Sequence, residues 1–140
     1  MNIIERIKSN FKNRGLYVTL DPNDNSVTFS PKLYKLVKPK MNDKAKVIVV
    51  RVCNAVVDNP DDNCTIYGFI INPSIGQETQ LADVQYNSKH DCYGFETLVP
   101  TVNLIFNDNN LPAFKPQIFK VVPSVSSIDT CYLLLPPKKN

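Results

Sequence analysis

The sequence has one histidine, four glycines and no tryptophan among its 140 residues. Histidine is the usual general base of enzymes, so a single copy leaves few ways to build an acid–base site. The four glycines (Gly15, Gly68, Gly76 and Gly94) do not form the glycine-rich loop with which proteins cradle nucleotide phosphates. We therefore exclude the P-loop and dinucleotide-binding motifs, and the nucleotide chemistry that depends on them.

Long apolar runs are also missing. Residues 1–14 carry charge throughout, and nowhere does the chain offer the roughly 18 consecutive apolar residues that a membrane-spanning helix needs. We expect neither a signal peptide nor a membrane anchor, and a location in the cytoplasm or in a virion. In a reducing compartment the four cysteines (Cys53, Cys64, Cys92 and Cys131) should remain thiols.

The residues that are abundant favour strands over helices. Four alanines stand against fifteen valines, and β-branched and aromatic side chains fit a pleated surface. Eleven prolines divide the chain into short segments, because a proline removes a backbone donor and is tolerated mainly at strand ends and turns. The composition predicts a mostly β fold: one domain over residues 1–140, built as an antiparallel β-sandwich or open barrel with one N-terminal amphipathic helix.

Apolar alternation between turn signals predicts about eight strands. The run at 46–57 is apolar on both alternating faces, which is typical of a strand covered on both sides. The polar stretch 74–91 alternates weakly and fits a loop, a strand or a short helix. The remaining strands are predicted at 16–20, 26–30, 65–72, 93–99, 101–106, 117–122 and 130–135.

Three segments stand outside this strand pattern. Residues 1–15 are predicted to form a helix, because Asn2 can cap it, Glu5 completes a capping box and Gly15 supplies a left-handed end. Residues 31–45 are rich in lysine and proline, and we expect an extended connector or arm there. Residues 136–140 form a polar tail.

Charge is distributed unevenly along the chain although the net charge is only +3. Residues 1–51 sum to +7, residues 52–114 to −7 and residues 115–140 to +3. Separate basic and acidic surfaces would steer association between partners, whereas a fold that interleaves the segments would cancel the effect. The basic residues predicted to form an interaction surface are Arg6, Lys8, Lys12, Arg14, Lys32, Lys35, Lys38, Lys40, Lys138 and Lys139.

One set of residues suggests nucleophilic catalysis. Cys92 could supply a thiol, His90 a base, and Asp91 or Asp129 a carboxylate that orients the ring. Nothing in the local sequence fixes these groups together. An exposed loop histidine beside a cysteine that opens a strand explains the pattern more simply, so we expect no enzyme.

Two metal sites are conceivable and both are disfavoured by spacing. Cys53, Cys64, Cys92 and His90 would make a nominal zinc set, but zinc ligands usually come in pairs two to four residues apart, and buried thiols behave as small hydrophobes. The carboxylates of Asp58, Asp61 and Asp62 lack the alternating spacing and glycine of a calcium loop. We expect no metal and no cofactor.

The sequence therefore predicts a non-enzymatic structural or interaction subunit of a larger protein assembly, such as a phage capsid or tail accessory protein. Its partners would be other protein subunits, including copies of itself, and no membrane. The alternative is a small intracellular binding module. That module would be an adaptor or immunity-type protein, or a less favoured nucleic-acid binder that uses the basic N-terminal segment.

Overall fold

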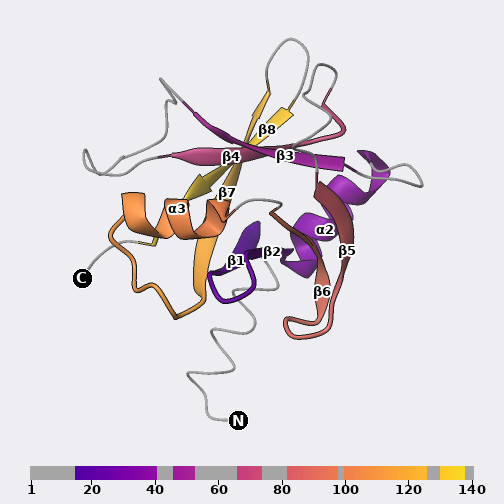
Figure 1. Cartoon of the computed structure of the whole chain (residues 1–140). Coiled ribbons are helices and arrows are strands. Elements are labelled where there is room, and N and C mark those ends of the chain that lie inside the picture. The colour runs from indigo at the N-terminus through magenta and orange to yellow at the C-terminus, as the bar shows by residue number, and fades with distance from the viewer. Residues whose placement is uncertain are drawn as a thin grey trace.

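Eight antiparallel strands form one closed barrel in the computed structural model, which describes residues 15–40, 46–52, 66–73, 82–97, 100–125 and 130–137 (Figure 1). The order around the barrel is β1-β2-β6-β5-β3-β4-β8-β7, and β7 pairs with β1 to close it. The strands are β1 (Tyr17–Asp21), β2 (Ser26–Phe29), β3 (Lys46–Arg51), β4 (Tyr67–Ile71), β5 (Ala82–Asn87), β6 (Cys92–Glu96), β7 (Gln117–Val125) and β8 (Thr130–Leu135).

The predicted fold class is confirmed, because the described part of the chain is mostly β, antiparallel and eight-stranded. The barrel is closed, so its strands have partners on both sides and the sheet has no long free edge. The alternating apolar residues of the strands point inward. Inside, the ring centroids of Phe29 and Phe69 lie 5.5 Å apart, and those of Phe69 and Tyr132 lie 5.0 Å apart.

The expected extended connector at 31–45 is wrong for its first ten residues. They form helix α2 (Pro31–Val37) and a 3₁₀ turn, η1 (Lys38–Lys40). Ser30 caps the helix by accepting a hydrogen bond from the Leu33 N–H at 3.3 Å, and Pro31 occupies the first helical position, where its missing donor costs nothing. Leu33 and Val37, one turn apart, are buried in the core.

The predicted strand at 101–106 is also wrong, because this segment begins helix α3 (Thr101–Asp108). A strand would place Val102, Leu104 and Phe106 on one face. The helix instead buries Val102, Ile105 and Phe106, spaced three and four residues apart, and leaves Leu104 53% exposed. Both helices contribute to the same core as the barrel.

Two smaller predictions are refined by the structure. The weakly alternating stretch contains β5, followed by a turn at residues 88–91. Proline does not always end a strand, since β7 continues through Pro123. Because β1 pairs only with residues 117–120, this part of β7 has a side without a β1 partner, where a missing N–H is tolerated.

Several predicted features lie outside the described residues. They are the N-terminal helix at 1–14, the end of the strand predicted at 46–57, the aspartate cluster at 58–62, and Lys138 and Lys139 of the tail.

Candidate functional site

A buried carboxylate joins the turn after β1 to the turn after β5. The side chain of Asp21 is 0% exposed, and its Oδ2 lies 2.6 Å from the Lys89 Nζ and 2.9 Å from the His90 Nε2. We call these three residues the Asp21 clamp. The lysine is half exposed, whereas the histidine is largely covered.

Each turn is shaped by asparagine and aspartate side chains. The Asp21 Oδ1 accepts a hydrogen bond from the Asn23 N–H at 2.9 Å, and the Asn87 Oδ1 accepts from the N–H groups of Lys89 and His90 at 3.0 and 3.2 Å. Such side chains bond their own backbone a few residues on and so favour tight turns. The sequence thus sets both turns locally, and barrel closure brings them together.

The electrostatics of the clamp favour an ionised Asp21. Burial alone would raise its pKa, but hydrogen bonds from Lys89, His90 and the Asn23 N–H outweigh burial and lower the pKa to about 2. The hydrogen bond to Asp21 in turn raises the pKa of Lys89. The Lys89 ammonium group and the His90 ring nitrogen share one carboxylate oxygen, which is an arrangement suited to fixing two turns.

The catalytic set considered from the sequence is arranged differently in the structure. His90 contacts Asp21, which is 69 residues away, rather than its neighbour Asp91. Asp91 instead accepts a hydrogen bond from the Tyr86 hydroxyl. Cys92 is a half-buried thiol at the start of β6, and Asp129 lies outside the described residues.

The predicted absence of metal sites stays a prediction. Cys53 and Cys64 of the nominal zinc set, and all three aspartates of the calcium hypothesis, lie outside the described residues. Within the described ranges, no group of three or more histidine, cysteine, aspartate or glutamate side chains is placed to hold a metal ion. Cys131 lies half buried on β8, where burial raises the pKa of its thiol.

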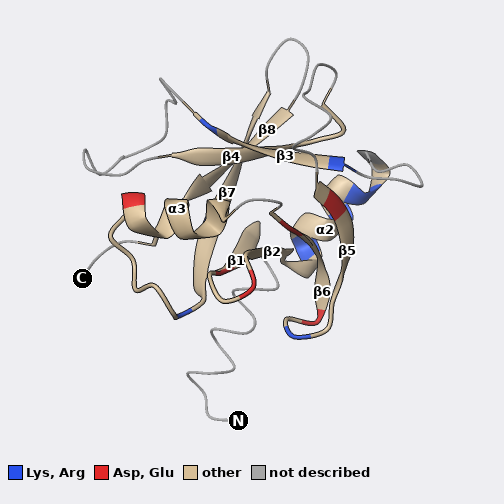
Figure 2. Cartoon of the chain, viewed as in Figure 1, with Lys and Arg blue, Asp and Glu red and all other residues tan. Residues whose placement is uncertain are grey.

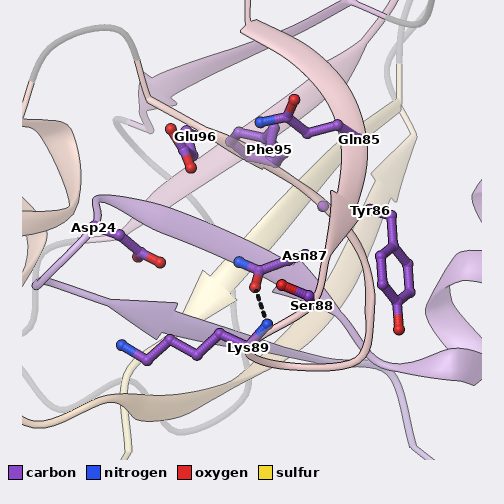
Figure 3. Close-up of a pocket in the computed structure, with 9 residues that line it drawn as sticks. Asp24, Gln85, Tyr86, Asn87, Ser88, Lys89, Phe95 and Glu96 are labelled. Carbon is purple, nitrogen blue, oxygen red and sulfur yellow. Dashed lines mark hydrogen bonds between the residues drawn. The ribbon is translucent and has the colours of Figure 1, made fainter.

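Beside the clamp is a polar pocket of about 260 Å³ (Figure 3). Asp24 of the β1–β2 turn lines one side, and Gln85, Ser88, Lys89 and Glu96 of the β5–β6 hairpin line the other. Figure 3 shows the carboxylates of Asp24 and Glu96 to one side of the hairpin and the ring of Tyr86 to the other. No local pattern indicated this pocket, because its walls come from segments about 60 to 70 residues apart in the chain.

The opposite face of the hairpin carries a row of tyrosines. The rings of Tyr34 and Tyr93 stack with centroids 4.6 Å apart, and Tyr86 meets Tyr93 edge-on at 5.5 Å. The Lys38 Nζ lies 5.9 Å from the centroid of the Tyr34 ring, within cation–π range. Helix α2 therefore packs on one face of the hairpin while the pocket opens on the other.

The predicted basic interaction residues can be placed in part. Lys32, Lys35 and Lys38 are exposed on α2 and at the start of η1. In Figure 2 the blue segments of α2 lie close to β5. Lys40 ends η1. The predicted basic residues outside the described part of the chain are Arg6, Lys8, Lys12, Arg14, Lys138 and Lys139.

An exposed phenylalanine marks the loop between α3 and β7. The side chain of Phe114 is 84% exposed, and its backbone oxygen accepts a hydrogen bond from the Asn23 Nδ2 at 3.1 Å. The loop is therefore tied to the same β1–β2 turn that carries Asp21 and Asp24. An isolated aromatic residue in a loop has no periodic pattern, so Phe114 does not stand out in the sequence.

None of the helices in the described segments has the length and apolar character that crossing a membrane requires. No family model, curated protein or solved structure matches this chain.

Proposed function

We propose that this protein is a non-enzymatic structural or interaction subunit of a larger protein assembly, such as a virion component. The observation that carries the proposal is Phe114, an aromatic ring left almost wholly in water on a loop fixed to the β1–β2 turn. Aromatic side chains that become buried on association dominate the energetics of interfaces. Leu104 and Ile118, which flank the same loop in sequence, are exposed as well.

The proposal is tested by the native mass of the purified protein, measured by light scattering across a range of concentrations at low and high salt. We expect a mass above that of the 15.8 kDa monomer. Phe114→Ser should lower it, because the exposed ring supplies apolar area to the contact.

Val125→Ser is the matched control, because Val125 is 82% exposed near the other end of β7. It should leave the mass unchanged. A protein that stays monomeric at every concentration and salt, alone and in an extract of its source, would contradict the proposal.

A second candidate, nucleic-acid binding, is favoured by one observation. Lys32, Lys35 and Lys38 are exposed around Tyr34, and lysines beside aromatic rings can hold phosphates next to stacked bases. Binding of this kind should weaken steeply with salt, with a log–log slope set by the number of phosphates neutralised. Fluorescence anisotropy with a labelled single-stranded oligonucleotide measures that slope, and replacing the three lysines with glutamine should flatten it.

A further inference from the structure

Three tyrosine rings form a row on the side of the β5–β6 hairpin that meets helix α2. Tyr86 and Tyr93 lie directly opposite each other in the antiparallel pair, and they are 51% and 39% exposed. Tyr34 of α2, the least exposed of the three, stacks on Tyr93, and the Lys38 Nζ lies 5.9 Å from the centroid of its ring. The ring most open to solvent in this row is therefore that of Tyr86.

The Tyr86 ring is held in place although it is exposed. Its edge-on contact with Tyr93 at 5.5 Å fixes one side of the ring, and its hydroxyl donates a hydrogen bond to Asp91. A side chain that is already fixed loses little conformational freedom when a ligand binds to it. Exposed aromatic groups rimmed by polar residues are typical of interaction sites.

Helix α2 places lysines beside this row and no acid. Residues 31–40 contain four lysines and neither aspartate nor glutamate. Lys38 and Lys35 lie about 40 and 100 degrees around the helix axis from Tyr34, so they border the tyrosine contact. Neither these two lysines nor Lys32 forms an ion pair within the described part of the chain, whereas the lysines of β3 and of the β5–β6 turn each pair with an aspartate.

Exposed rings bordered by unpaired lysines match the chemistry of a single-stranded nucleic acid. Its bases can stack on aromatic side chains, because every base has a π-face, and lysines neutralise its phosphates. A duplex is a poorer match, because its bases are stacked on one another and present only their edges in the grooves. An acidic peptide or an anionic lipid surface would use the lysines but has no flat ring to stack on Tyr86.

We propose that the ring of Tyr86, supported by Tyr93, is a stacking platform for a base of a single-stranded nucleic acid whose phosphates contact the lysines at positions 32, 35 and 38. The inference rests on nucleic-acid binding, the second candidate function, and names the form of the ligand and the ring that contacts its bases. It does not depend on the assembly that Phe114 supports.

Two oligonucleotides of equal charge separate stacking from charge. One is a fluorescein-labelled single strand of about 12 thymidines, a length within the range of known single-strand sites, and the other is an abasic strand with the same number of phosphates. Fluorescence anisotropy should show that the wild type binds the thymidine strand at least about fivefold more tightly, because a stacked base contributes at least this much. Equal affinity for the two strands would overturn the stacking platform and leave the second candidate function standing, whereas binding of neither strand would overturn both.

Substitutions at Tyr86 identify the ring. Tyr86→Leu should weaken binding of the thymidine strand at least about fivefold and leave the log–log salt slope unchanged, because it removes a ring and no phosphate contact. Tyr86→Phe keeps the ring, loses only the hydroxyl bond to Asp91, and should bind as the wild type does. Phe114→Leu is the matched control, since it removes an exposed ring from another loop and should not change the affinity. A Tyr86→Leu variant that binds like the wild type, or no more weakly than Phe114→Leu, would overturn the inference.

Asp91 provides a test of the opposite sign. Its carboxylate lies at the Tyr86 hydroxyl and should repel the phosphates of a strand stacked on this ring. Asp91→Asn removes the charge, and asparagine tolerates the left-handed backbone of this position, where φ is 54°. The variant should bind the thymidine strand about two- to fivefold more tightly at low salt, and this gain should shrink as salt screens the charge. Unchanged or weaker binding would overturn the proposed position of the strand.

Discussion

Asp21→Asn removes the charge at the centre of the clamp while keeping the size of the side chain. The substitution takes away the carboxylate that contacts the Lys89 Nζ and the His90 Nε2, but it retains an oxygen for the Asn23 N–H. Because the Asp21 side chain is fully buried, water cannot take the place of the carboxylate beside the largely covered His90 ring unless the two turns move apart. We expect the variant to fold and to be less stable than the wild type.

The size of the effect follows from the pKa of Asp21. A fall from 3.8 in the unfolded chain to about 2 in the folded protein corresponds to roughly 2 kcal/mol in the free energy of unfolding. Lys89 is half exposed, so solvent screens its share, and we expect about 1 to 2 kcal/mol at neutral pH. A carboxylate with a lowered pKa stabilises the fold above its unfolded pKa. The contribution should therefore be complete at pH 6 and disappear between about pH 4 and pH 2.

Urea denaturation at a series of pH values between about 7 and 2 measures this contribution as the difference between wild type and variant. The other carboxylates titrate in both proteins and cancel. Asp24→Asn is the control, since it changes a carboxylate of the same turn and leaves the clamp intact. A difference between wild type and Asp21→Asn that stays constant from pH 6 to pH 2 would refute the reasoning.

Three further predictions concern packing and are checked by denaturant midpoints. Gly94→Ala should destabilise the protein by at least about 2 kcal/mol, because its Cβ would lie 2.1 Å from a backbone oxygen of β2, whereas Gly68→Ala, whose Cβ would meet a movable thiol at 2.6 Å, should cost less. Ile105→Ala should cost about 2 to 4 kcal/mol and Leu104→Ala less than about 1, and equal costs would contradict the helical assignment of α3. Tyr67→Phe should cost about 1 to 2 kcal/mol, because it removes the 2.6 Å hydrogen bond from the Tyr67 hydroxyl to the Asp108 carboxylate at the end of α3. Burial and this hydrogen bond raise the pKa of Tyr67 to about 12, so spectrophotometric titration of the wild type should show a tyrosine that ionises near pH 12.

The fold class was predictable because the β-branched composition and the apolar alternation are properties of short segments of the sequence. The two helices α2 and α3 were not predicted. The signals for α2 were present: Ser30 before Pro31, with Leu33 and Val37 one turn apart. A proline after an apolar run is typical of a strand end, but it is equally suited to the first position of a helix, which is where Pro31 lies. In α3 the residues at 102, 104, 105 and 106 are apolar. Over so short a segment this spacing fits both the two-residue period of a strand and the 3.6-residue period of a helix, and only packing against the core distinguishes them.

The candidate site could not be predicted, for a different reason. The strand order places β6 between β2 and β5, so it joins segments that local patterns treat as unrelated. Asp21 looks in the sequence like one more turn aspartate, and His90 like a loop histidine. Only the register of β2 with β6 shows that Ser26 and Glu96 share a face. Long-range pairing, rather than residue type, makes the site.

The β5–β6 hairpin connects the Asp21 clamp, helix α2 and the polar pocket. Its tip is held by the Asp21 clamp, one face stacks on α2 through Tyr93, and the other face lines the pocket. Because the tip is tied to the β1–β2 turn, loss of the clamp should loosen the pocket wall and the stacked tyrosines together. Exchange of the exposed lysines of α2 should leave the stability of the fold nearly unchanged, since these side chains lie in solvent. The two sets of variants therefore separate residues that hold the hairpin in place from residues that only cover its surface.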